Sequence, residues 1–285
     1  MKTILNYILS VILAIVLIAV FFINLVCNTV LNEEYVLSKL EKENYYAKIY
    51  EQVEENFENY IYQSGLDETV LKNIVTMDKV KKDTKIIIGN IYKGTKQDID
   101  IEEIRDNLNK NIQNSLSTTN ITSSQRKAID TYIDEICNEY KTTISYFSSN
   151  TKIGDEFAKI VKFMSLVKNI LLIVMGIDFL LLLVLNLKGF YKFISFSGMS
   201  FTICGLTLVF FNIFVNSRIK IKTITILNDV ISEVLRNILS EELKLIINYG
   251  IISIFIGVFL IIISNLLHNF KERNKLNKRE KIEGE

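Results

Sequence analysis

The stretch NYGIISIFIGVFLIIISNLL, residues Asn248–Leu267, contains no charged side chain. A helix of about 20 apolar residues is long enough to cross the hydrocarbon core of a bilayer. In lipid, every backbone polar group must find its partner inside the protein, and a helix satisfies this requirement within one segment. The stretch therefore predicts a transmembrane helix. Three other stretches have the same character, namely Ile4–Val26, Val167–Leu187 and Ile194–Val215.

The composition separates into apolar and charged blocks, as is typical of membrane proteins. Of the 285 residues, 49% are hydrophobic and 23% are charged, and there is no proline. The absence of proline permits long uninterrupted helices. The formal net charge of +1 gives no general attraction to nucleic acid, and no basic and aromatic patch indicates a nucleic-acid surface. The expected environment is the lipid bilayer.

The first apolar stretch is interpreted as a retained anchor, the alternative being a cleaved signal peptide. The apolar region of a signal peptide spans about 7–15 residues and ends in small residues. The stretch Ile4–Val26 is longer, and the residues before Cys27 are Asn24, Leu25 and Val26. The same residues argue against lipid attachment at Cys27, which needs a small residue before it.

Lysine and arginine near the ends of the apolar stretches predict the orientation. Lys2 precedes the first stretch, and Lys188 and Lys192 lie in the short connection between the second and third. The tail after the fourth stretch is also basic. Four spans place all these residues on one side, so we expect a multi-pass protein of the cell membrane with both termini in the cytoplasm. The opposing basic residues are Lys159, Lys162, Lys168, Arg218, Lys220 and Lys222.

The predicted fold is all-α, a four-span helical integral membrane protein with an extracytoplasmic helical-bundle domain. Its segments follow from the apolar stretches. They are span 1 (1–27), the extracytoplasmic helical domain (28–166), spans 2 and 3 with a short cytoplasmic loop (167–215), an extracytoplasmic amphipathic helix (216–247), span 4 (248–268) and a basic cytoplasmic tail (269–285).

Apolar residues in the extracytoplasmic domain recur at helical spacing, and strand patterns are nearly absent. One helix is predicted over residues 36–60, with Gly65 placed to end it, and a short helix includes Leu71 and Val75. One interpretation is that the first and last helices of the domain continue into spans 1 and 2. Further helix boundaries are predicted at Thr76 or Asp78, Gly94, Asp100, and Ser123 or Ser124.

The segment 216–247 carries an apolar stripe that includes Ile224, Leu227, Val234 and Ile238. We expect this stripe to dock on the extracytoplasmic domain, because its polar face mixes acids and bases. The alternative is a position in the lipid interface, which favours a basic polar face. Ser240 is predicted to cap a following helix that runs into span 4.

Asp178 is the sharpest candidate for a functional residue, because a charge in the middle of a span is costly. Thr202, Cys204 and Thr207 of span 3 are expected at a comparable depth. The favoured interpretation is a neutral carboxyl group that joins two helices through a hydrogen bond. The alternative is a proton or cation relay.

Small residues recur along spans 3 and 4, where they allow close approach of two helix backbones. Packing within one protomer is the expected role, with a homo-oligomer as the alternative. The residues are Gly198, Thr202 and Gly205 in span 3 and Gly250, Ser253 and Gly257 in span 4.

The sequence predicts no catalytic residue, no cofactor and no metal site. His268 is the single histidine, so no zinc pair is available, and no nucleophile or phosphate-loop motif is present. The three cysteines are too few for a disulfide scaffold, although a Cys27–Cys137 bond stays open. The acidic patch Glu51, Glu54, Glu55 and Glu58 has oxygens for Ca²⁺, but without a ligand loop it is interpreted as a solvated helix face.

We therefore expect a non-catalytic bacterial membrane protein whose extracytoplasmic domain binds a protein partner or senses the envelope. The alternative is a transport component. The order of one span, a large outside loop, two spans, a smaller outside loop and a last span resembles the four-span permease subunits of cell-division-type ABC systems. This resemblance covers the layout alone, and it implies coupling to a separate ATPase. A proton-linked transporter that uses Asp178 is a further form of this alternative.

Overall fold

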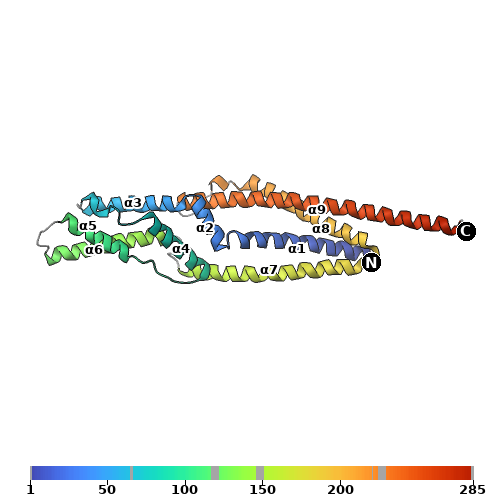
Figure 1. Ribbon diagram of the computed structural model, residues 1–285, viewed down its shortest axis with the longest axis horizontal. Coiled ribbons are helices and arrows are strands. Elements are labelled where there is room, and N and C mark those ends of the chain that lie inside the picture. Colours follow the sequence, from blue (N-terminus) through green and yellow to red (C-terminus); the bar gives the residue numbers. More distant parts are fainter. Residues whose placement is uncertain are drawn as a thin grey trace. The chain divides into compact units, whose positions relative to one another are not determined.

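The computed structural model describes residues 2–64, 67–116, 122–145, 151–219, 221–223 and 229–283. All regular structure in these ranges is helical, which confirms the predicted all-α class (Figure 1). Gly65, Ile224 and Leu227, which the sequence placed at a helix end and in the apolar stripe, lie outside the described residues.

Four helices are long and apolar enough to cross a membrane, as predicted. All four extend beyond the apolar stretches at one or both ends, because helix-forming polar residues continue the same backbone pattern. The four are α1 (Lys2–Asn28), α7 (Thr151–Leu185), α8 (Phe190–Arg218) and α9 (Asp229–Glu283).

The chain forms two compact units, which are described separately. The apolar unit comprises Met1–Asn28, Phe163–Thr225 and Leu235–Glu285, and the polar unit comprises Thr29–Lys162 and Ile226–Val234. The division falls inside α7 and α9.

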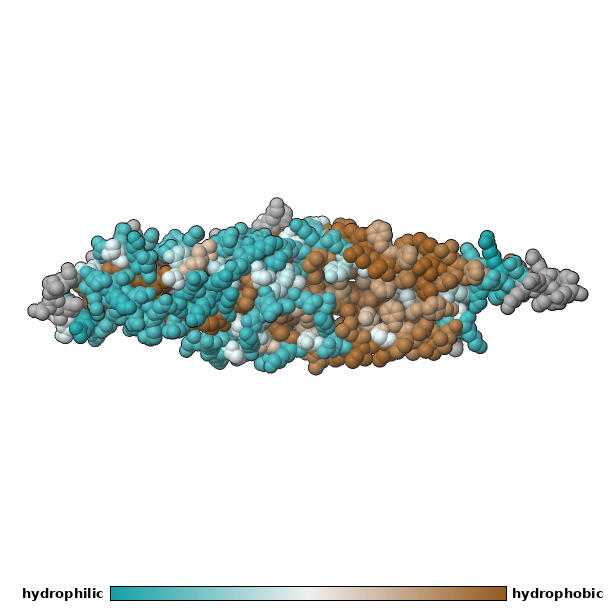
Figure 2. Space-filling model, in the orientation of Figure 1, coloured by the Kyte–Doolittle hydropathy of each residue, from teal (hydrophilic) through white to brown (hydrophobic). Residues whose placement is uncertain are grey.

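The apolar unit exposes large hydrophobic side chains over much of its surface (Figure 2). Phe255 of α9 is 70% exposed, and Phe210 of α8 is 66% exposed. Apolar surface on this scale is unfavourable in water and favourable in hydrocarbon. Together with the lengths of the four helices, it indicates a membrane protein.

The polar unit buries one apolar side of each of its helices. Val53, Val80, Ile104, Leu108 and Ile136 are fully buried. Its helices are α2 (Glu33–Lys42), α3 (Tyr45–Ser64), α4 (Met77–Lys93), α5 (Glu102–Ser115) and α6 (Ser123–Ile144), with a 3₁₀ turn η1 (Glu68–Leu71) between α3 and α4.

The helix predicted over residues 36–60 is two helices, α2 and α3. The break occurs at Asn44, whose φ of 53° is in the left-handed region that asparagine tolerates better than most residues. The side chain of Asn32 accepts a hydrogen bond from the Tyr35 N–H and caps α2, so α2 does not continue α1. At the other end of the polar unit, α6 ends at Ile144 and α7 begins at Thr151.

The predicted ends of α4 are observed, whereas the predicted start of α6 is shifted by one residue. Thr76 caps α4, and Gly94 ends it with a φ of 66°. The cap of α6 is Thr122, one residue before the predicted Ser123, because Thr122 and Gln125 form a reciprocal capping box.

Two other predicted helix starts differ from the structure. Asp100 accepts a hydrogen bond from the Glu102 N–H, but the residue that directly precedes α5 is Ile101. Ser240 lies inside α9 and does not begin a helix.

Small residues bring α8 and α9 into backbone contact. A Cβ atom on Gly257 would lie 2.6 Å from the Gly198 carbonyl oxygen, and one on Gly205 would lie 2.5 Å from the Gly250 carbonyl oxygen. Real Cβ atoms do not approach backbone atoms this closely. The four glycines therefore permit the close packing of α8 and α9 within one chain.

We predict that Gly257→Ala destabilises the apolar unit by about 1–3 kcal/mol, the usual cost of overpacking. Gly176→Ala is the matched control, because a Cβ atom there meets nothing within 4 Å. The measurement is the unfolding midpoint of the full chain in mixed detergent micelles. Equal midpoints for the two variants would contradict the close α8–α9 contact.

Candidate functional site

Asp178 lies on the buried side of α7, with 4% of its surface exposed. Met175, Phe179 and Leu182, its neighbours along the helix, belong to an apolar cluster with Leu13 of α1. The carboxylate oxygen Oδ2 is buried and has no hydrogen-bond partner among the described residues. A buried polar atom without a partner is unfavourable, and the cost is larger for an ionised carboxyl group.

The polar residues expected beside Asp178 have other contacts. The Thr202 hydroxyl donates to the Gly198 carbonyl at 2.9 Å, and the Thr207 hydroxyl donates to the Ile203 carbonyl at 2.9 Å. Cys204 is buried in a second apolar cluster with Leu208 and Ile246. Among the described residues, the four therefore do not form one polar site, and no hydrogen bond from Asp178 to span 3 is present there.

Two other polar pairs join the helices of the apolar unit. Asn6 of α1 and Asn186, which follows α7, exchange side-chain hydrogen bonds of 3.1 and 2.9 Å. Ser10 of α1 and Ser200 of α8 lie 2.9 Å apart, oxygen to oxygen, and each also bonds a backbone carbonyl of the other helix. Asn6 and Ser10 are polar interruptions of an apolar stretch, so the sequence held a signal for them, but it did not identify their partners.

A cavity of about 350 Å³ lies in the apolar unit, and Asp178 is not among its lining residues. Leu17, Phe21 and Leu172 make most of its wall apolar, and Lys168 is its one charged lining residue among those described. Ser253 of α9, predicted as a packing residue, lines this cavity. A path for ions needs more polar positions than this wall supplies.

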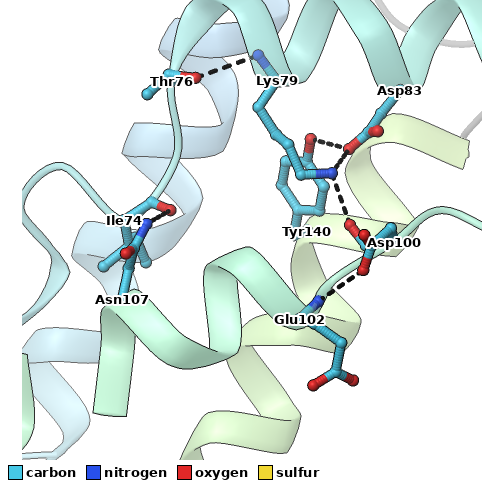
Figure 3. A network of polar contacts seen from close by, with 8 residues as sticks. All are labelled: Ile74, Thr76, Lys79, Asp83, Asp100, Glu102, Asn107 and Tyr140. Carbon is cyan, nitrogen blue, oxygen red and sulfur yellow. Dashed lines mark hydrogen bonds and ion pairs between the residues drawn. The ribbon is translucent and has the colours of Figure 1, made fainter. Parts of the chain in front are cut away.

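A buried polar network, which sequence reasoning missed, crosses the polar unit (Figure 3). Lys79 Nζ donates to Asp83 Oδ2 at 2.6 Å and to the Asp100 carbonyl at 2.6 Å. The Tyr140 hydroxyl donates to the same Asp83 oxygen at 2.7 Å. The spacing of Lys79 and Asp83 on one helix face was visible in the sequence, whereas the approach of Tyr140 was not.

This network has the properties of a structural support. Lys79 and Asp83 are 7% and 1% exposed, and Tyr140 is fully buried. Burial and the Asp83 carboxylate together raise the pKa of Tyr140 well above its usual value, so the hydroxyl keeps its proton and remains a donor. The network ties α4 to α6 and to Asp100, two residues before α5 begins. Breaking such a buried pair by removing one partner is strongly destabilising.

An acidic groove of about 550 Å³ lies between α3 and η1 in the polar unit. Glu54, Glu58 and Glu68 supply negative charge, and Lys72 is the single basic residue among its described lining residues. The buried side chains of Phe57 and Leu71 give it an apolar floor. Two of these glutamates belong to the acidic patch that the sequence analysis interpreted as a solvated helix face.

The wall formed by η1 is held in place by local contacts. The Asp67 carboxylate accepts from the backbone N–H and the hydroxyl of Thr69, and these bonds lower the pKa of Asp67. The Asn111 side chain of α5 donates to the carbonyls of Val70 and Lys72, each at 3.0 Å. This wall of the groove is therefore held in place before any ligand binds.

The cysteines and acidic residues form no further site within the described ranges. Cys27, Cys137 and Cys204 are all free thiols. No group of three or more histidine, cysteine or acidic side chains is arranged there to hold a metal ion.

No protein-family model matches the chain, and neither a curated protein nor a solved structure shows significant similarity to it.

We predict that Asp178→Leu leaves the protein at least as stable as the wild type, because it replaces an unpaired buried oxygen by apolar atoms. Asp178→Asn keeps the shape, and it should change stability by no more than about 0.6 kcal/mol, the average for a hydrogen bond between membrane helices. Both are measured as unfolding midpoints in mixed micelles. A large loss of stability for Leu alone would show that the carboxyl group has an essential partner.

The same two variants distinguish a structural role of Asp178 from a role in proton transport. An amide does not titrate in the relevant range, so a proton relay fails with Asn as completely as with Leu. We expect both variants to restore growth of a deletion strain at matched protein levels. Failure of a normally folded Asn variant would instead favour the relay.

Proposed function

We propose that this chain is a non-catalytic bacterial membrane protein whose polar unit lies outside the cytoplasm and binds a protein partner there. The acidic groove between α3 and η1 is the observation that carries the proposal. Both termini lie in the cytoplasm in this arrangement, because the basic residues at Lys2, Lys188 and the tail after span 4 favour that side.

The chemistry of the groove selects a basic segment with apolar side chains. Three carboxylates against one lysine attract positive charge, and complementary charge speeds encounter and rejects acidic partners. The apolar floor around Phe57 and Leu71 gives the buried contact from which affinity is expected. Because Asn111 and Asp67 already fix η1, binding loses little free energy to ordering of the protein.

Transport is the second candidate, and the buried carboxyl group of Asp178 is the observation that favours it. A relay needs neighbouring groups that pass the proton on. Thr202 and Thr207 are bonded to carbonyls of their own helix, so they do not supply such a path. Partner binding is therefore preferred.

The predicted sidedness is tested by cysteine labelling in a variant that lacks the native cysteines. Lys110→Cys on exposed α5 should react with an impermeant thiol reagent in intact cells, whereas Asn277→Cys in the tail should react only after permeabilisation. Both positions are exposed, so access within the protein is not limiting. Labelling of Asn277→Cys alone in intact cells would invert the assignment.

The groove is tested with the triple variant Glu54→Gln, Glu58→Gln and Glu68→Gln. A photo-crosslinking residue at Thr69 should yield an adduct in cells, and the triple variant should lose most of it because the attracting charge is gone. The crosslinked peptide, identified by mass spectrometry, should be basic.

The matched control removes the same charge from exposed glutamates that do not line the groove, by Glu55→Gln, Glu103→Gln and Glu135→Gln. It should keep the adduct and should restore growth of a deletion strain, whereas the groove variant should not. An adduct that is insensitive to both triple variants, or an acidic crosslinked peptide, would overturn the proposal.

A further inference from the structure

A basic cavity of about 380 Å³ lies in the apolar unit, at the end where α1 and α8 begin. Four lysines and a histidine contribute to its wall, and no carboxylate is among its described lining residues. The lysine side chains are exposed, and none of them joins an ion pair within the described part of the chain. The basic residues are Lys2, Lys188, Lys192, Lys271 and His268.

Two helix N-termini add to this positive potential. Helix α8 begins at Phe190 after Gly189, without a side-chain cap and without an acidic residue in its first turn. Helix α1 begins at Lys2 and also lacks an acidic residue in its first turn. The first N–H groups of a helix have no partner inside the helix, and the helix dipole favours an anion beside them.

The floor of the cavity is polar and fixed. Asn6 and Asn186 are each 2% exposed, and they hold each other through their amide groups. Asn6 lines the cavity and uses one of its two amide N–H groups in this pair, and the second donates no other hydrogen bond within the described part of the chain. The ring of His268 lies 4.7 Å from that of Tyr191, and its buried Nδ1 has no hydrogen-bond partner among the described residues.

The surroundings of the cavity are apolar. Leu187 and Phe190, which flank the lysine-bearing turn, are 66% and 53% exposed. A ligand with a phosphate group and acyl chains satisfies both the basic cavity and these surfaces, whereas free phosphate satisfies only the first.

We propose that this cavity binds the phosphate group of an anionic phospholipid. The lysines neutralise the phosphate, the first turn of α8 and the Asn6 amide donate hydrogen bonds to it, and the acyl chains lie on the apolar surface around Leu187 and Phe190. Basic pockets between transmembrane helices bind anionic headgroups in this way.

The test uses the purified full chain in neutral detergent and native mass spectrometry with short-chain lipids. Dioctanoyl phosphatidylglycerol should bind, and dioctanoyl phosphatidylcholine should bind at least about tenfold more weakly. The variant Lys188→Gln with Lys192→Gln should weaken phosphatidylglycerol binding roughly 25-fold, since one lysine near an anionic headgroup contributes about fivefold. Replacing both lysines by arginine should keep the binding.

The control Lys162→Gln with Lys244→Gln removes the same charge from exposed lysines that do not line the cavity, and it should bind as the wild type does. Glycerol 3-phosphate separates the two sources of phosphate. If it binds as tightly as phosphatidylglycerol, the cavity is a soluble-phosphate site and the lipid proposal fails. Equal affinity for the two lipids, or equal losses in the cavity and control variants, also overturns it.

Discussion

The need to satisfy every backbone hydrogen bond without water governs the apolar unit. Within hydrocarbon, a continuous helix meets this need by itself, and a chain without proline has no residue that interrupts it. In hydrocarbon, burial of apolar surface no longer drives the helices together, so close packing and hydrogen bonds between the helices must do so. The glycines at 198, 205, 250 and 257 provide the close packing by letting the backbones of α8 and α9 approach, while Asn6 and Ser10 attach α1 by hydrogen bonds.

The sequence predicted best where the controlling interaction is local. Each span depends on about 20 consecutive apolar residues, and the two ends of α4 depend on the adjacent residues Thr76 and Gly94. The spans and these helix ends could therefore be predicted. The break at Asn44 could not, because an asparagine inside a helical pattern is compatible with either a helix or a left-handed turn. At Ser240 the error was the opposite one, because a helix start was predicted inside a continuous helix. Serine favours helix starts but is also tolerated in helix interiors.

The candidate sites depend on residues far apart in the chain, and this explains why they were harder to predict. Asp178 was found because its cost in a membrane is a property of one position, but its expected neighbours turned out to bond elsewhere. Glu54 and Glu58 were visible as acidic residues, yet the groove also needs Glu68 of η1, which is separate from α3. A helical pattern says which residues share a face. It does not say which other helix meets that face.

The lysines of the two units differ in whether neighbouring groups compensate their charge, and this difference bears on function. Lys79 is buried, and Asp83, the Asp100 carbonyl and the Tyr140 ring compensate its charge, as a structural cation requires. At the mouth of the basic cavity, Lys188 and Lys192 lie beside the first turn of α8 with no carboxylate in the lining. Like charges that line one cavity repel one another. An anion that enters removes the repulsion, which is why the uncompensated cluster, and not the compensated one, has the character of a binding site.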